Sequence, residues 1–260
     1  MKAMTWINTL TTLLCVILIA PIVLIVILSF SGDAIMQFPP HSFSLRWYTD
    51  FFADTRWRKA LYSSLTIGLG ACLIATFVGF LAAYALVRGQ FKAKKLMLSF
   101  VLLPLIIPNI ITAIALYFLS AKLGLIGAKP WISVTHAVIG LPIVVMILIS
   151  ALQSVDENIE RAAYSLGASR SMTFVKVVIP LALPGVVSAA LFSFLTSFDE
   201  LVIAMFLSGL SSETLQVRIW NSLQMDAEPI IASVSALLIA VTVILLGVDA
   251  LLRHKRARRA

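Results

Sequence analysis

Six apolar stretches of about 20 residues, with the charged residues gathered between them, constrain the fold of this chain more than any other feature. A helix rises about 1.5 Å per residue, so each stretch is long enough to cross a hydrocarbon layer of roughly 30 Å. Backbone groups in lipid must be hydrogen-bonded within the segment, and the alternating pattern of membrane β-strands is absent from the sequence. We therefore predict an all-α polytopic membrane protein with six transmembrane helices, at residues 10–30, 63–87, 96–119, 131–152, 184–208 and 229–252.

Composition supports a membrane protein and argues against a nucleic-acid partner. Of the 260 residues, 60% are hydrophobic and 12% are charged, whereas soluble domains are about half apolar and a quarter charged. The net charge is +8, but five basic residues lie in the short tail 253–260, directly after the last apolar stretch. Such clusters fix membrane topology and contact anionic lipid. Both cysteines lie in apolar stretches and indicate nothing about the redox compartment.

The distribution of basic residues predicts that both termini are cytoplasmic. With the amino terminus inside, the inner segments hold thirteen of the twenty lysines and arginines. The connection 88–95 alone has four bases and no acid. Inner loops carry this excess in membrane proteins. The first stretch, Leu10–Phe30, exceeds the usual apolar core of a signal peptide, so we expect it to remain as a span.

These boundaries divide the chain into three parts. Residues 1–62 comprise the first transmembrane helix and an outer segment, residues 63–252 form the core, and residues 253–260 are the basic cytoplasmic tail. The connection 31–62 is rich in proline and aromatic residues, including Trp47, Tyr48 and Trp57. This composition favours an ordered segment along the outer membrane interface, and an ordinary aromatic belt is the alternative.

The cytoplasmic connection 153–183 predicts two short helices that meet at an angle. Ser154 followed by Glu157 has the form of a capping box at the start of the first helix. Gly167 stands where this helix would end, because glycine enters the left-handed conformation without steric cost. Ser169 or Ser171 can cap the second helix.

Two prolines mark the end of the second short helix and the start of the next span. The second helix is expected to stop at Pro180, because proline lacks the N–H that continues a helix. Pro184 then opens the fifth span, at a first-turn position that proline favours.

The first short helix offers a small-residue face at Ala162 and Ala163. Small side chains allow the close approach of another helix or groove, so this face suits docking to another protein. The alternative is an amphipathic helix that rests on the bilayer.

This connection resembles the EAA loop in permease subunits of type I ATP-binding-cassette (ABC) importers. In that family a Glu-Ala-Ala element precedes a glycine by four residues, and nine residues then lead to Ile-x-Leu-Pro. Here Ala162, Ala163 and Gly167 are followed by nine residues and then by Val-Val-Ile-Pro, ending at Pro180. The chain departs from the pattern because Arg161 precedes the alanines and Glu160 stands one place further upstream.

The resemblance implies a type I ABC importer permease with the MetI-like fold, in a bacterial plasma (inner) membrane. It assigns ATPase coupling to Glu160, Ala162, Ala163, Gly167 and Pro180. The implied partners are two ATPase subunits, a homologous second permease and an extracytoplasmic substrate-binding protein; a permease homodimer is the alternative. The sequence contains no Gly-Lys dipeptide, so it has no phosphate loop. We expect a transport subunit rather than an enzyme, with no cofactor of its own and with ATP used by the partner.

The resemblance extends over nearly the whole chain. The stretches 38–52, 196–209 and 214–223 are similar to the second permease of spermidine/putrescine importers. That similarity implies a polyamine substrate. Permeases of importers for ferric iron, opines or thiamine share much of the scaffold and are the alternatives.

Ionisable residues inside membrane spans are functional candidates. Asp199 and Glu200 lie in the fifth predicted span and form part of a candidate translocation pathway. Asp199 is expected in the outer half of the membrane, where it attracts a cation or pairs with a partner subunit. A secondary transporter that uses either acid as a proton site is the competing function. Asp249, near the inner end of the sixth span, is expected to be structural.

Two further features of the spans bear on function. Pro104 and Pro108, one turn apart and followed by Asn109, predict a bend in the third span. The bend suits a helix that lines the pathway, and a static packing kink is the alternative. His136 is expected to be a hydrogen-bonded packing residue. No nucleophile or paired metal-ligand motif accompanies it, which disfavours a membrane hydrolase or a metal site.

Overall fold

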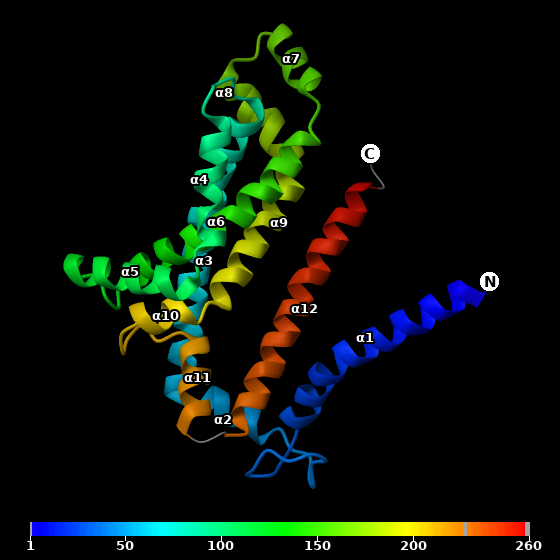
Figure 1. The fold of residues 1–260 in the computed structure, drawn as a ribbon, viewed down its shortest axis with the longest axis vertical. Coiled ribbons are helices and arrows are strands. Elements are labelled where there is room, and N and C mark those ends of the chain that lie inside the picture. The colour runs from blue at the N-terminus through cyan, green and yellow to red at the C-terminus, as the bar shows by residue number, and fades with distance from the viewer. Residues whose placement is uncertain (1, 226–227, 258–260) are drawn as a thin grey trace. The chain divides into compact units, whose positions relative to one another are not determined.

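The computed structural model describes residues 2–225 and 228–257, and side chains within 6–225 and 228–251. These residues are almost entirely helical, in accordance with the predicted all-α class (Figure 1). The side chains of the predicted basic tail 253–260 lie outside this set. The helices in chain order are α1 (Lys2–Ser29), α2 (Arg46–Ala53), α3 (Thr55–Arg88), α4 (Lys94–Ile106), α5 (Asn109–Leu123), α6 (Lys129–Gln153), α7 (Glu157–Ser165), α8 (Arg170–Thr173), the π-helix η1 (Phe174–Val178), α9 (Ile179–Phe198), α10 (Val202–Leu207), α11 (Leu215–Met225) and α12 (Ile230–Ala257).

Five helical stretches are long and apolar enough to cross a membrane. They are Trp6–Ser29, Thr55–Arg88, Lys129–Gln153, Arg170–Phe198 and Ile230–Leu251. The pair α4 and α5 meets the same test only when taken together, because a 99° bend separates the two helices. The predicted total of six spans therefore depends on counting this bent pair as one crossing.

The described residues fall into two compact units, which we treat separately. One unit lies within Met1–Arg58 and Arg218–Ile244, and the other lies within Lys59–Val217 and Leu245–Ala260. The helices α3, α11 and α12 each contribute residues to both units. All residues predicted to couple to an ATPase, and all predicted pathway residues, belong to the second unit.

In the first unit, the connection after α1 is ordered, as predicted. Tyr48 on α2 is hydrogen-bonded through its hydroxyl to Ser29 Oγ at the end of α1, at 2.7 Å. Ser233 Oγ donates to the Trp47 carbonyl oxygen at 3.3 Å. The backbone N–H of His41 donates to Asp33, which lowers the pKa of that carboxyl. The helix of the second predicted span, α3, begins at Thr55, ahead of the predicted start at residue 63.

In the second unit, α6 and α9 pack closely along their length. Valine, leucine and alanine side chains from α3, α6 and α9 form a buried cluster that includes Ala71, Val144, Leu148 and Ala189. Gly185 on α9 lies so close to α6 that a Cβ built on it would collide with the Ala151 side chain. Small residues permit this approach, which is how membrane helices gain packing contacts without a hydrophobic driving force between them.

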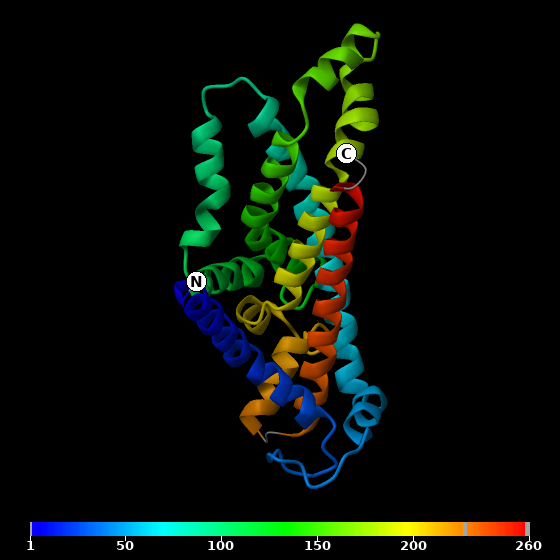
Figure 2. The same cartoon turned by 90° about the vertical axis from the view of Figure 1, so that its right-hand side faces the viewer.

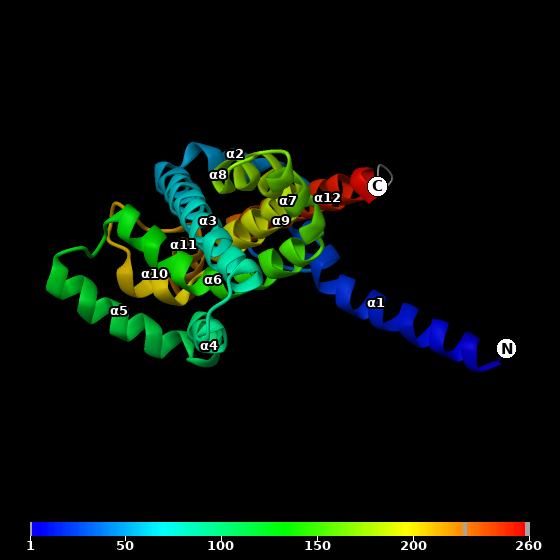
Figure 3. The same cartoon turned by 90° about the horizontal axis from the view of Figure 1, so that it is seen from above.

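The predicted proline bend is confirmed. Pro104 lies inside α4, and Pro108 stands immediately before α5, whose first residue is Asn109. Figure 3 shows α4 nearly end-on while α5 runs across the page. Pro108 cannot donate an N–H to α4, so the helix cannot pass straight through this position. Whether the bend lines a pathway stays a prediction.

The fifth span differs from its predicted bounds of 184–208. The helix does not stop at Pro180, and Pro184 does not open the span but lies inside α9. A single helical stretch instead runs from Arg170 to Phe198. The π-helix Phe174–Val178 leads directly into α9, and Pro180 stands in the first turn of α9, a position that proline tolerates.

Candidate functional site

The connection between α6 and α9 forms an elbow of two helices at an angle, as predicted. Figures 1 and 2 show that α7 lies beyond the ends of α3, α6 and α9, whereas α8 leads directly into η1 and α9. Asp156 rather than Ser154 caps α7, because its side chain accepts the Asn158 backbone N–H at 2.9 Å. The predicted capping box is therefore wrong. Ser154 belongs to the end of α6 and donates its hydroxyl to the Ala151 carbonyl oxygen.

Gly167 forms the corner of the elbow. Its φ of 84° lies in the left-handed region, which confirms the prediction that a glycine is needed there. The N–H of Gly167 donates to the Tyr164 carbonyl oxygen at 2.9 Å, and the N–H of Ala168 donates to that of Ala163 at 3.0 Å. These bonds close the end of α7. Ser169 then caps α8 by accepting the Met172 N–H at 3.2 Å, as predicted.

The outer surface of the elbow combines small and apolar side chains. Ala162 is exposed and Ala163 is half-buried. Beside them Leu166 is 89% exposed, and Tyr164 and Met172 are also exposed. An apolar surface on a polar connection is unusual for a segment that only meets water, so this geometry fits a surface that another protein covers.

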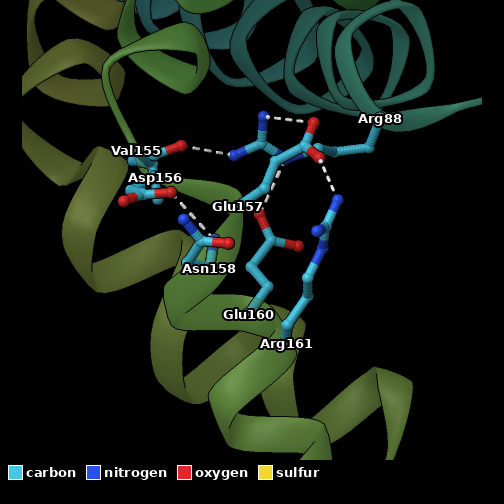
Figure 4. A network of polar contacts seen from close by, with 7 residues as sticks. All are labelled: Arg88, Val155, Asp156, Glu157, Asn158, Glu160 and Arg161. Atoms are coloured by element: carbon cyan, nitrogen blue, oxygen red, sulfur yellow. Dashed lines mark hydrogen bonds and ion pairs between the residues drawn. The ribbon is translucent and has the colours of Figure 1, made fainter.

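Glu160 points into the chain and binds Arg88, the last residue of α3 (Figure 4). Arg88 Nε donates to Glu160 Oε1 at 2.7 Å, and Nη2 donates to the Val155 carbonyl oxygen at 2.6 Å. Nη1 lies 3.5 Å from Glu157 Oε1. The acid predicted to contact an ATPase is thus buried against the chain's own arginine.

Sequence reasoning missed Arg88 as a site residue. It was read only as one of the bases that set membrane orientation, together with its neighbours in the connection 88–95. The sequence did contain an indication of this pairing. Arg88 is a basic residue at the predicted inner end of a span, and Glu157 and Glu160 are acidic residues at the start of the elbow on the same predicted side. A cavity of 990 Å³ lies between these segments and is lined by Arg88, Lys94, Arg170 and aromatic side chains.

The other predicted coupling residues lie apart from this cavity. Pro180 is in the first turn of α9. Ahead of it, Phe174 of η1 packs edge-on against Tyr84 of α3, with ring centroids 4.8 Å apart, and against Phe80 at 5.6 Å. The elbow is therefore fastened to α3 by aromatic contacts as well as by Arg88.

Asp199 and Glu200 do not lie inside a helix, contrary to the prediction, because α9 ends at Phe198 and α10 begins at Val202. Asp199 is exposed and accepts a hydrogen bond from Gln216 Nε2 at 3.0 Å. Glu200 instead bonds to its own backbone segment, because its Oε1 accepts the Ile203 N–H at 3.0 Å. Glu200 thus satisfies a free N–H at the start of α10, whereas Asp199 presents its carboxylate at the break between the helices.

Two further polar residues tie helices together within the second unit. His136 on α6 is buried, and its Nδ1 is 2.9 Å from Ser197 Oγ on α9, which confirms the expected packing role. Asp249 on α12 is also buried and accepts a hydrogen bond from Ser188 Oγ at 2.6 Å. Among the described residues, no group of three or more histidine, cysteine or acidic side chains is arranged to hold a metal ion.

The apolar helices and the two-helix elbow between α6 and α9 fit the permease subunits of ABC importers, and the family comparison supports that class. The family model "binding-protein-dependent transport system inner membrane component" matches residues 75–259, and the chain belongs to this family. It is accordingly a multi-pass inner membrane component.

Named relatives and solved structures agree with this assignment. A spermidine/putrescine transport system permease protein, PotC, of Haemophilus influenzae is 32% identical over 235 residues, which cover 90% of this chain and 91% of the relative. A putrescine transport system permease protein, PotI, of Escherichia coli is 31% identical, covering 85% and 81%. The fold matches a crystal structure of a bacterial ABC transporter for alginate import with a TM-score of 0.73 and 17% identity, covering 98% and 96%.

Proposed function

We propose that this chain forms half of the translocation pathway of a polyamine importer and is driven by a separate ATPase. The observation that carries the proposal is the elbow itself. Its corner at Gly167 is held in a conformation that glycine favours, and it presents Ala162 and Leu166 outward. In the assembled importer, α7 seats on an ATPase subunit on the cytoplasmic side, and both chain termini lie on that side.

The remaining partners follow from the family. We infer two ATPase subunits, a homologous second permease and an extracytoplasmic binding protein that delivers the substrate. ATP-driven closure of the ATPases moves the permeases between inward-open and outward-open states. The chain itself contributes no cofactor site in this scheme, and ATP binds to the partner.

Polyamines are the proposed substrate class because two relatives are named for their transport and because of the position of Asp199. The helical stretch Arg170–Phe198 contains 29 residues, and its length of about 43 Å exceeds the hydrocarbon thickness. With the elbow in the cytoplasm, Asp199 lies toward the outer side. An exposed carboxylate there attracts a cationic substrate as the binding protein releases it.

Cross-linking tests the docking surface. Cys15 and Cys72 are first replaced by serine, and a single cysteine is introduced as Ala162→Cys. We expect a reagent with a maleimide at one end and a photoreactive group at the other to join this variant to the ATPase subunit of the co-expressed importer. Ala121→Cys, an exposed alanine on α5, is the control and should capture no ATPase. The proposal of ATPase docking is rejected if the Ala162→Cys importer transports substrate but no cross-link between this cysteine and the ATPase subunit is ever found.

Substrate identity is tested on the purified complex in lipid vesicles. Spermidine or putrescine, delivered by the binding protein, should stimulate ATP hydrolysis, and a neutral sugar should not. If a ferric chelate, an opine or thiamine stimulates ATP hydrolysis instead, the chain is still a permease subunit but polyamines are not its substrate. Uptake that survives ATP depletion but stops with an uncoupler would favour a secondary transporter.

The variant Asp199→Asn should lower polyamine uptake about tenfold, because it removes a negative charge and keeps a hydrogen-bond acceptor for Gln216. Uptake of radiolabelled putrescine by vesicles measures the effect. Glu200→Gln is the matched control and should retain uptake, since its side-chain oxygen still accepts the Ile203 N–H. Equal uptake in the wild type and Asp199→Asn contradicts the pathway role, and loss of complex assembly would point to a subunit contact instead.

A further inference from the structure

Arg88 connects the end of a membrane-spanning helix to three points near the start of the elbow. Its side chain is only 12% exposed. The three guanidinium nitrogens lie toward Glu160, Val155 and Glu157, at 2.7, 2.6 and 3.5 Å (Figure 4). Val155 precedes α7, and the two glutamates belong to its first turns. One side chain therefore fixes both the position and the direction of α7.

The pairing is stronger than an ordinary surface ion pair. The Glu160 side chain is 7% exposed, so neither charge of the Arg88–Glu160 pair is well hydrated. Removing one partner of a buried pair leaves the other charge without compensation, which is far more costly than breaking an exposed pair. By contrast, the Arg161–Glu157 pair on the same helix is largely exposed and contributes little.

The connections on either side of α7 make this attachment important for motion. Residues 154–156 link α7 to α6, and the corner at Gly167 links it to α8. Neither link is helical, so each can change its angle. Besides Arg88, Tyr84 of α3 forms a side-chain hydrogen bond with Glu160. Within the elbow itself, α7 packs against α8 and η1.

We propose that Arg88 is a positioning residue that locks α7 to the inner end of α3, so that an ATPase moving the elbow also moves α3. This inference rests on the proposed coupling function. The aromatic contacts of Phe174 with Tyr84 and Phe80 fasten α3 to the other arm of the elbow. With both arms held, α3, α7 and η1 move as one body. When Arg88 is lost, α7 keeps the Tyr84 contact at Glu160 but loses the attachments at Val155 and Glu157. The helix then pivots more freely on its two links, and less of its displacement reaches α3.

The substitution Arg88→Lys separates positioning from charge. Lysine keeps the positive charge but carries its donors on one nitrogen, so it cannot reach Val155, Glu157 and Glu160 together. We expect the complex to assemble and to hydrolyse ATP at the basal rate. The amount of substrate imported per ATP hydrolysed should fall about tenfold, as measured in proteoliposomes with the binding protein.

Two controls separate positioning from folding. Arg170→Lys makes the same substitution in the same cavity, and among the described residues Arg170 forms no ion pair with Glu157 or Glu160. It should keep the wild-type ratio of import to hydrolysis. Glu160→Gln keeps an oxygen acceptor for Arg88 and should give a smaller loss than Arg88→Lys. The proposal is overturned if Arg88→Lys imports as much substrate per ATP hydrolysed as the wild type. It is also overturned if Arg88→Lys impairs assembly but the complexes that do form import a normal amount of substrate per ATP.

A distance measurement tests the lock without relying on transport. Spin labels at the exposed residues Leu81 of α3 and Leu166 of the elbow should give a narrow distance distribution in the wild type. Arg88→Lys should broaden it, and an equally narrow distribution overturns the proposal. Failure of the wild-type chain to bind any ATPase would instead reject the proposed function, so the two failures are distinguishable.

Discussion

Replacing Gly167 by valine should abolish substrate uptake while the ATPase continues to hydrolyse ATP. The φ of Gly167 is 84°, and a β-branched side chain in this region costs roughly 1–2 kcal/mol or more. The strain is relieved when the corner opens, which turns α7 and moves Ala162 away from its docking position. Uptake into inverted or reconstituted vesicles and ATP hydrolysis are measured in parallel.

Two variants show whether the effect belongs to the corner. Gly167→Asn should retain much of the uptake, because asparagine tolerates the left-handed conformation better than other side chains. Gly124→Val introduces the same strain at the end of α5, where φ is 67°, and open space surrounds both glycines. It should lower stability without uncoupling. Undiminished uptake by Gly167→Val would refute the role of the corner.

The second large effect is expected for Gly185→Leu, which should destabilise the protein by about 3 kcal/mol. Gly185 allows α9 to approach α6, and even a Cβ at this position collides with the Ala151 side chain. The helices must separate along the contact that holds the second unit together. Thermal unfolding in detergent, followed by tryptophan fluorescence or by loss of monodisperse protein, measures the change.

Matched variants identify the collision as the cause. Gly247→Leu places the same side chain on another membrane helix, where nothing lies within 4 Å of the added Cβ, and should change stability little. Gly185→Ala alone should be destabilising, and the double variant with Ala151→Gly should recover most of the loss. Equal losses from Gly185→Leu and Gly247→Leu would show that helix proximity is not responsible.

Features set by local chemistry could be predicted from the sequence. The apolar stretches predicted the helices, because lipid leaves the backbone no other partners. Gly167 predicted the left-handed corner, and Pro104 with Pro108 predicted the bend, since each residue restricts its own backbone. A serine cap, at Ser169 or Ser171, was predicted because a serine hydroxyl accepts a nearby backbone N–H, and the structure shows Ser169 in this role. Each of these predictions requires only residues within a few positions of one another.

Features that depend on tertiary packing could not be predicted in this way. Arg88 and Glu160 are 72 positions apart, and nothing in either local sequence specifies their pairing. Pro180 was expected to end the second short helix and Pro184 to open the fifth span, but one helical stretch from Arg170 to Phe198 contains both prolines. Asp199 was placed within a span because its neighbours are apolar. The helix ends before it, and Gln216 from a later segment of the chain holds its carboxylate.

The uninterrupted helix from Arg170 to Phe198 has a mechanical consequence. The stretch is about 43 Å long, so a tilt of about 5° of the whole helix at one end would carry the other end through roughly 4 Å. Asp199 directly follows this stretch, so a tilt of the helix would move its carboxylate by a similar distance. We therefore expect small rotations at the Gly167 corner to displace the break between α9 and α10 at the other end of the stretch.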